Sequence, residues 1–187
     1  MGAGMTFTEI PLGGAAIISL NPIRDERGFF ARTFCTATMR KHGLIDTFPQ
    51  ANHSMSVGAG TIRGLHYQTP PAAEAKLVRC LRGEVYDVMV DVRKGSDTFL
   101  QWFGCTLAEG DFTVVYVPPG FAHGYQSLTD GAEVVYQSSA EYTPHLEGRI
   151  RYDEPRVGIS WPVATPILSP KDATTPWLAA EFEGVVL

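Results

Sequence analysis

The chain has 187 residues, 44% of them hydrophobic, so it can bury a substantial core, and its composition excludes the disordered, collagen-like and membrane classes. The formal net charge of -5 and the lack of any Lys/Arg cluster argue against nucleic-acid binding, because phosphates favour a basic surface. Cys35, Cys80 and Cys105 lack CxxC spacing, which predicts reduced thiols in a cytoplasmic protein.

The start of the chain carries no positively charged leader, and no apolar run is long enough to span a membrane. We therefore expect neither secretion nor membrane insertion. Met5 could be the natural start, in which case residues 1–4 are an added extension. No repeat, low-complexity tract or convincing interdomain linker interrupts the sequence, so residues 1–187 are expected to form a single domain.

Runs rich in Val, Ile, Phe and Tyr recur along the chain between Gly, Pro, Asp and Asn, a pattern typical of short strands joined by turns. In chain order, the expected strands cover residues 16–20, 28–34, 61–67, 76–81, 84–92, 102–107, 112–117 and 133–139. Residues 85–91 alternate only partly between apolar and polar side chains, which predicts a strand packed between layers rather than one with a wet face.

Helices are few in this pattern. Residues 36–42 form the one clear helix candidate near the start, with Thr36 as a possible N-cap and Gly43 as the stop. A turn or short helix follows Ser169, which could cap it, and the Pro-rich segment 155–176 is expected to wrap over the strands. Many short strands with regular turns predict an all-β sandwich or barrel with a few short helices.

Two spaced motifs make the fold prediction more specific. Gly60 and His66 have the Gly-x5-His spacing that opens the first cupin motif, and Pro118, Gly120 and His123 match the Pro-x-Gly-x-x-His of the second. The chain therefore resembles the cupins. That resemblance implies a cupin-like jelly-roll β-sandwich.

The ligands of a metal-binding cupin are missing from these motifs. A second histidine is expected two residues after the first, where Gln68 stands, and the acidic ligand that should follow meets Ala72 and Ala73. The position four residues after the histidine of the second motif is Ser127. A transition-metal site needs three or four N, O or S ligands, so no metal is predicted and His66 is free to act as a base.

Five separated segments together resemble the dTDP-4-dehydrorhamnose 3,5-epimerase family. They are RGLHYQ at 63–68, EAKLVRC at 74–80, VMVDVR at 88–93, GFAHG at 120–124 and SPKD at 169–172, and the resemblance begins at DERGFF, residues 25–30. The match runs in order over most of the chain. It implies an epimerase of a nucleotide-linked 4-keto-6-deoxyhexose, the first choice being dTDP-4-dehydro-6-deoxyglucose in deoxysugar (dTDP-rhamnose) biosynthesis.

The resemblance also implies catalytic roles. His66 would remove the proton next to the C4 ketone, Asp172 would orient His66, Lys76 would support the enolate oxygen, and Tyr136 would return a proton from the other face. These roles agree with the chemistry, because inversion of a carbon needs a base near neutrality, an acid on the opposite face and a cation where enolate charge develops. No cofactor is implied.

Substrate-binding roles follow from the same resemblance. The family binds its nucleotide diphosphate through residues that correspond here to Arg27, Gln50, Asn52 and Arg63, and arginine's planar fork suits diphosphate oxygens. Three further positions carry over as substrate contacts: His123, Glu147 and Lys171. The implied partner is therefore a nucleotide-diphosphate sugar. A homodimer is also implied, since members of the family exchange N-terminal strands between subunits.

Some interpretations remain open at this point. Tyr136 lies in an apolar run where most tyrosines are core residues, Asp172 could merely cap the last turn, and His123 could be structural. Two family positions differ here: Ala31 and Arg32 replace a ligand-contacting glutamate, and Glu141 replaces an aromatic residue. The alternatives are therefore a single-position epimerase or ketoisomerase on another nucleotide sugar, and, from another class, a non-catalytic sugar-binding cupin.

Overall fold

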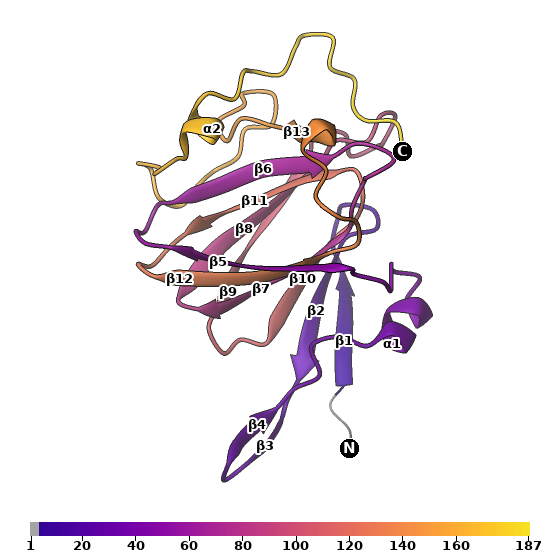
Figure 1. Cartoon of the computed structure of the whole chain (residues 1–187), viewed down its shortest axis with the longest axis vertical. Coiled ribbons are helices and arrows are strands. Elements are labelled where there is room, and N and C mark those ends of the chain that lie inside the picture. The colour runs from indigo at the N-terminus through magenta and orange to yellow at the C-terminus, as the bar shows by residue number, and fades with distance from the viewer. Residues whose placement is uncertain (1–3) are drawn as a thin grey trace.

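The computed structural model describes residues 4–187, and its two large sheets are antiparallel and stacked face to face (Figure 1). The six-stranded sheet has the order β1 (Gly4–Glu9), β2 (Ala16–Asn21), β10 (Thr113–Val117), β7 (Lys76–Arg82), β12 (Ala132–Ser138) and β5 (Gln50–Ser56). The five-stranded sheet has the order β13 (Glu147–Arg149), β6 (Ile62–Gln68), β11 (Phe121–Ser127), β8 (Glu84–Asp91) and β9 (Trp102–Ala108). The predicted all-β, cupin-like jelly-roll sandwich is confirmed.

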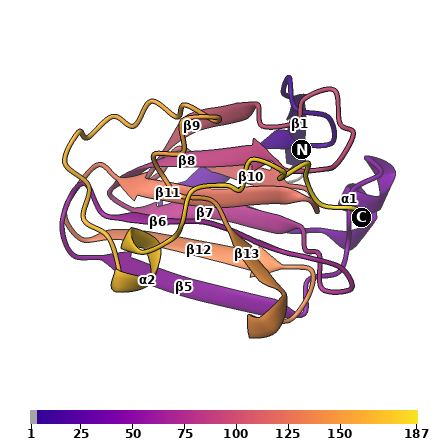
Figure 2. The same ribbon diagram turned by 90° about the horizontal axis from the view of Figure 1, so that it is seen from above.

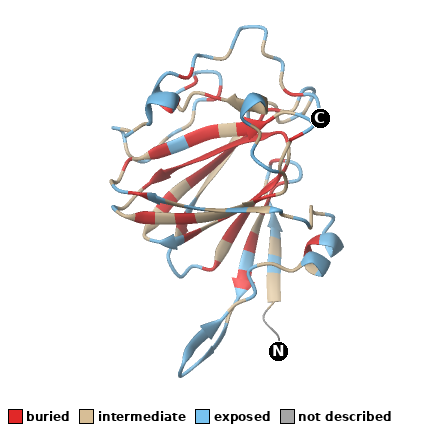
Figure 3. Ribbon diagram, viewed as in Figure 1, coloured by how far each residue is buried: buried red, intermediate tan, exposed pale blue. Residues whose placement is uncertain are grey.

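The main core fills the space between the two sheets. Val78 and Val134 of the six-stranded sheet meet Val85, Met89 and Leu107 of the five-stranded sheet, and each of these side chains is buried. Figure 3 shows buried residues concentrated on the strands of both sheets. Because successive residues of a strand point to opposite faces, this inner set leaves the outer faces to be covered by other segments.

The outer face of the five-stranded sheet is covered by the C-terminal segment, which runs across it in Figure 2. Val88 and Val90 pack there against Ile150, Val157 and Val185, and isolated bridges join Thr61 to Ile167 and Arg93 to Val185. Strand β8 is consequently buried on both faces, which explains its partial alternation. The expected wrapping of the Pro-rich tail is confirmed, and α2 (Pro170–Ala173) lies within it.

The helix boundaries differ in one detail from the prediction. Helix α1 covers Thr36–Lys41, but its N-cap is Cys35, which makes no capping hydrogen bond through its side chain, so the assignment of Thr36 as N-cap is wrong. Gly43 follows with φ of 68°, a left-handed conformation that ends a helix at little cost for glycine. Ser169 caps α2 as predicted, because its hydroxyl accepts a hydrogen bond from the backbone N–H of Asp172.

Several strands were not predicted, and one was predicted too long. The sequence pattern did not predict β1, β3 (Ile23–Asp25), β5, β11 or β13, and the strand expected at 28–34 is only β4 (Gly28–Phe30). It pairs with β3 in a hairpin that projects from the sandwich and is exposed throughout (Figures 1 and 3). The short η1 helix (Pro144–Leu146) precedes β13.

In the described part of the chain, no helix is long and apolar enough to cross a membrane. The suggested extension ahead of Met5 includes residues 1–3, which lie outside the described residues.

Candidate active site

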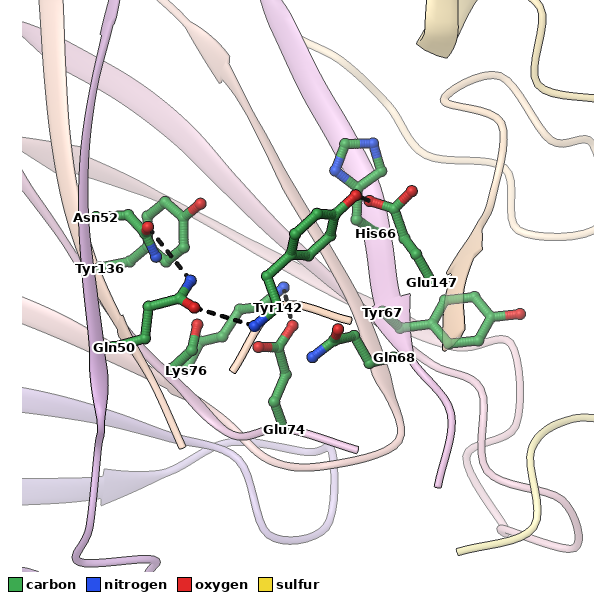
Figure 4. A pocket seen from close by; sticks show the side chains of 11 residues that line it. Gln50, Asn52, His66, Tyr67, Gln68, Glu74, Lys76, Tyr136, Tyr142 and Glu147 are labelled. Atoms are coloured by element: carbon green, nitrogen blue, oxygen red, sulfur yellow. Dashed lines mark hydrogen bonds and ion pairs between the residues drawn. The ribbon is translucent and has the colours of Figure 1, made fainter. Parts of the chain in front are cut away.

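A cavity of about 280 Å³ opens between the edges of the two sheets, with β5, β7 and β12 on one side and β6 on the other (Figure 4). A second cavity of about 200 Å³ shares His66, Lys76 and Tyr136 with it, so the two are parts of one pocket. The lining residues are Gln50, Asn52, His66, Tyr67, Gln68, Glu74, Lys76, Tyr136, Ser138, Tyr142 and Glu147 in the first cavity, with Ser54, Arg63, His123 and Tyr125 added in the second.

His66 and Asp172 form a hydrogen-bonded pair at one wall of this pocket. His66 lies on β6, and its Nε2 is 2.8 Å from Oδ1 of the buried Asp172 on α2, whose Oδ2 accepts from the Ser169 hydroxyl at 2.9 Å. Burial opposes ionisation of Asp172, but the hydrogen bonds from His66 and Ser169 outweigh it, so the pKa of Asp172 is lowered. A carboxylate on Nε2 fixes the proton there and leaves Nδ1 able to accept one.

Tyr136 faces this pair from the opposite sheet. It lies on β12, where it pairs in register with Asn52 of β5 and Val78 of β7. Figure 4 shows its hydroxyl pointing into the pocket. Burial raises the pKa of the Tyr136 phenol above its ordinary value, so the hydroxyl stays protonated at neutral pH and can donate a proton. Tyr136 is therefore a pocket residue as well as part of an apolar strand.

Lys76 reaches the pocket from the start of β7 and is already paired. Its Nζ lies 3.0 Å from Oε1 of Glu74, and both side chains are only 10% exposed. Glu74 was not predicted as a site residue. Its position two residues before Lys76 could have indicated an ion pair with that lysine. Because an ammonium group has three N–H donors, Lys76 can hold Glu74 and still donate to a ligand oxygen.

His123 and Asp87 form a second histidine–carboxylate pair next to the first. His123 on β11 pairs in register with His66 on β6, and its Nε2 lies 2.8 Å from Oδ2 of Asp87 on β8. Both side chains are almost fully buried, and Oδ1 of Asp87 has no hydrogen-bond partner among the described residues. Asp87 was not predicted as a site residue, although an acidic residue in the middle of a mostly apolar strand was a usable signal.

Glu147 and Lys171 meet at the edge of the pocket. The buried Oε2 of Glu147, on β13, lies 2.6 Å from Nζ of Lys171 and 2.7 Å from Nη2 of Arg149. Burial would raise the pKa of Glu147, but the hydrogen bonds from Lys171 and Arg149 lower it overall. Adjacent residues of α2 thus bind two strands, since Lys171 contacts β13 while Asp172 contacts β6.

The residues expected to bind the nucleotide are only partly brought together. Gln50 and Asn52 lie on β5 at the pocket wall, where Gln50 Nε2 donates to Asn52 Oδ1 at 3.3 Å, and Arg63 lines the deeper cavity. Arg27, in contrast, lies in the β3–β4 hairpin, 83% exposed and paired with Asp25. It lines neither cavity of the described chain. Arg32, where the family has a glutamate, is exposed.

Glu141 and Tyr142 explain the second sequence departure. Glu141 is exposed and contributes its backbone carbonyl to a hydrogen bond with Gln68. The next residue, Tyr142, carries an aromatic ring at the pocket mouth, with its hydroxyl 3.4 Å from Oε1 of Glu147 (Figure 4). The pocket therefore keeps an aromatic side chain, which the comparison at position 141 alone did not reveal.

The chemistry of the pocket is that of acid–base groups. Within residues 4–187, no group of three or more His, Cys, Asp or Glu side chains could hold a metal ion. Gln68, at the place of a metal-binding histidine, is buried and hydrogen-bonded to backbone groups. The fold and the pocket define a cupin-type domain in which a histidine–carboxylate pair, a tyrosine and a lysine meet between the two sheets.

Comparison with known proteins specifies the family. The model of the family described as dTDP-4-dehydrorhamnose 3,5-epimerase matches residues 9–180, and the chain belongs to this family of enzymes. A dTDP-4-dehydrorhamnose 3,5-epimerase of Methanothermobacter thermautotrophicus is 42% identical over 173 residues, which cover 91% of this chain and 92% of that protein. A relative of the same description from Neisseria gonorrhoeae is 42% identical over 179 residues, or 95% of this chain. The chain spans only 54% of the Neisseria protein.

A solved structure shows the same fold with a ligand bound. The dTDP-6-deoxy-D-glucose-3,5-epimerase of Legionella pneumophila, in complex with dTDP-4-keto-L-rhamnose, superposes with a TM-score of 0.90 at 37% identity. The match covers 98% of this chain and 100% of the Legionella chain. The likeness therefore includes the whole sandwich and the segment that covers it.

Proposed function

We propose that this protein epimerises a nucleotide-diphosphate-linked 4-keto-6-deoxyhexose, with dTDP-4-dehydro-6-deoxyglucose as substrate and dTDP-4-dehydrorhamnose as product. One observation carries the proposal: His66, held by Asp172, and the hydroxyl of Tyr136 enter the same pocket from opposite sheets. The dTDP-sugar bound by the Legionella relative supports this substrate class.

The proposed reaction moves protons without a redox step. Nδ1 of His66 takes the proton from a carbon next to the C4 ketone, and the electrons of that C–H bond move to the ketone oxygen to form an enolate. Tyr136 then donates its hydroxyl proton to the opposite face of the same carbon while the ketone re-forms. Exchange with water restores both groups. Positioned acids and bases of this kind contribute typically ~10²–10⁴-fold each to the rate.

The enolate oxygen needs a stabilising donor in a pocket that excludes much of the water. Lys76 supplies a positive charge there. One of the three N–H donors of its ammonium group is held by the carboxylate of Glu74, which fixes the position of the charge. A preorganised cation at the position of developing negative charge lowers the barrier because it needs no reorganisation during the reaction. His123 is a further substrate contact, and Asp87 fixes its ring.

The nucleotide is proposed to lie toward the pocket mouth. Arg63, Gln50 and Asn52 offer N–H donors to the diphosphate and the base, and the partly exposed ring of Tyr142 offers an apolar face for the base. Glu147 and Lys171 complete this rim. Gln50, Asn52, Tyr142 and Glu147 line the first cavity, whereas Arg63 lines the deeper one, which His66 and Tyr136 share with the first.

A homodimer is proposed from the position of Arg27. The β3–β4 hairpin that carries it projects from the sandwich, and the residues Phe29 and Phe30 in this hairpin are 60% and 62% exposed. A second subunit that covers these rings would receive Arg27 near its own pocket. We further propose that residues 1–187 act as one domain and that the protein is cytoplasmic, where its three free cysteines would stay reduced.

Deuterium incorporation tests the proposal and separates its rivals. The protein is incubated with dTDP-4-dehydro-6-deoxyglucose in deuterated water, and the product is analysed by mass spectrometry and NMR. Two exchanged ring positions with inversion at both support a 3,5-epimerase. One exchanged position would show a single-position enzyme, and binding without any exchange would show a non-catalytic sugar-binding cupin.

A further inference from the structure

Gln68 ends strand β6 two residues after His66, and its side chain is engaged by backbone groups from two loops. Its Nε2 donates to the carbonyl of Ala72 at 3.1 Å and to that of Glu141 at 3.2 Å, while its Oε1 accepts from the N–H of Thr143 at 2.6 Å. The residue is only 3% exposed. An amide has two N–H donors, so both donors of this buried group are used.

Residues 139–143, which follow β12, form neither helix nor strand, and two glutamines hold them from opposite sheets. Gln68 of β6 binds the N–H of Thr143, and Gln50 of β5 binds the adjacent N–H of Tyr142 at 3.0 Å. Consecutive backbone amides are thereby fixed on the two sides of the pocket opening. Ser139 still bonds to the backbone of Ala75, but residues 141–143 lie beyond that ladder and depend on such side-chain contacts for a single conformation.

Tyr142 is the pocket-lining side chain of this segment. Its ring crosses the pocket mouth in Figure 4, with the backbone N–H bound by Gln50 at one end and the hydroxyl near Glu147 at the other. The ring is half exposed, so packing contributes less than it would in the core. Its position therefore depends strongly on the hydrogen bonds of residues 141–143.

We propose that Gln68 is a positioning residue for substrate affinity: it holds residues 141–143 so that the Tyr142 ring forms one wall of the nucleotide subsite. This inference rests on the proposed nucleotide-sugar function. The position that holds a metal ligand in metal-binding cupins thus serves here to order a rim segment. The hydrogen bonds of Gln68 go to Ala72, Glu141 and Thr143 and not to the His66–Asp172 pair, so its loss affects binding more than proton transfer.

Calorimetric titration with dTDP and steady-state kinetics test this role. Gln68→Leu removes the three hydrogen bonds, and we expect the Kd for dTDP and the KM to rise by at least roughly fivefold, as for a lost base–aromatic contact. The value of kcat should stay within about twofold, because the lost contact binds the substrate and the transition state equally. Gln68→Asn, which keeps the amide on a shorter side chain, should give the same result if the leucine variant folds poorly.

The double variant shows whether the effect passes through Tyr142. Tyr142→Ala alone should weaken dTDP binding, and Gln68→Leu should add little to it, because coupled residues are non-additive. Gln126→Leu is the matched control: Gln126 is a buried amide that binds both backbone groups of Val163, on the far side of the five-stranded sheet from the pocket. It should lower the melting temperature without changing dTDP affinity.

Three results would overturn the inference. These are an unchanged Kd in Gln68→Leu, full additivity with Tyr142→Ala, or a fall in kcat at constant KM. If the parent protein binds dTDP and epimerises the sugar, such a result rejects the role of Gln68 alone. If the parent protein neither binds dTDP nor exchanges substrate protons, the proposed function fails and this role fails with it.

Discussion

Nε2 of His66 lies 2.8 Å from Oδ1 of Asp172, although 106 positions separate the two residues in the chain. The contact exists because the C-terminal segment crosses the outer face of the five-stranded sheet and places α2 at the edge of β6. Ser169 starts the helix, fixes the backbone of Asp172 and donates to its carboxylate. The orientation of the base therefore depends on how the tail is anchored.

Replacement of either member of this pair should stop catalysis while the nucleotide still binds. His66→Ala removes the base, and Asp172→Asn removes the charge that stabilises the protonated ring, so we expect solvent deuterium exchange to fall by ~10²–10⁴-fold in each variant. Exchange into substrate is followed by NMR and dTDP binding by calorimetry. The double variant should lose no more than His66→Ala alone. A loss below about tenfold for His66→Ala would be inconsistent with the role of a base.

Lys76→Met should reduce both turnover and stability, for separable reasons. The variant removes the cation proposed to bind the enolate, at a cost of ~10²–10³-fold in kcat. It also leaves Glu74 buried without its partner, which costs roughly 3 kcal/mol of unfolding free energy.

Adding Glu74→Gln to Lys76→Met tests whether the two effects separate. The double variant should recover much of the stability but none of the turnover, as measured by urea unfolding and product formation. Recovered turnover in the double variant would show that Lys76 only neutralises Glu74.

Activity should resist chelators. Gln68, Ala72, Ala73 and Ser127 stand where cupin metal ligands would be, and the proposed acid–base groups need no Lewis acid. Dialysis against EDTA followed by the exchange assay should leave the rate unchanged. A rate that falls after EDTA and returns with zinc, iron or manganese would contradict this prediction.

Ionised Asp91 should stabilise the fold, and this stabilisation should decrease at acidic pH. It is fully buried; burial opposes its ionisation, but hydrogen bonds from Arg93, Ser96 and Thr98 outweigh that effect and lower its pKa from 3.8 to about 2. Because the pKa of Asp91 is lower in the folded than in the unfolded chain, its ionisation stabilises the fold at every pH above the unfolded-state pKa of 3.8. This stabilisation is lost as the pH falls from about 4 through about 2. The pH-dependent part is on the order of 2 kcal/mol.

Urea unfolding at pH 6 and pH 2.5 measures this contribution. The stability difference between the parent and Asp91→Asn should be largest at pH 6 and shrink at pH 2.5. Asp97→Asn, an exposed change in the same turn, is the control. A parent-to-variant difference that stays constant between the two pH values would exclude Asp91 as the source.

Periodicity predicted the strands that are buried and rich in branched residues, such as β2, β7, β8 and β10. It missed β5, whose sequence QANHSMS is polar because the strand lies at a sheet edge, and β11, whose glycines and polar residues suggest a turn although every residue of it is buried. Tertiary packing decides these strands, and local propensity does not.

Only the pocket residues that belong to sequence motifs could be predicted. The family resemblance indicated His66, Tyr136 and Asp172 from their motifs and spacing. The structure brings His66 and Tyr136 to one pocket, with Asp172 hydrogen-bonded to His66. The ion partners Glu74 and Asp87 could not be assigned, because their roles depend on which side chains the sheets place opposite them. For Arg27 the motif predicts ligand binding, but in the single chain this residue is exposed and lies outside the pocket.

Tyr136→Phe tests the central claim, that proton removal and return occur on opposite faces of the sugar. The change deletes only the hydroxyl, so packing of the ring between β5 and β7 should persist and the melting temperature should stay close to that of the parent. In deuterated water, the account predicts that His66 still exchanges the substrate proton while inverted product falls by ~10²-fold or more. Epimerisation at the parent rate, or exchange and inversion lost together, would contradict the account.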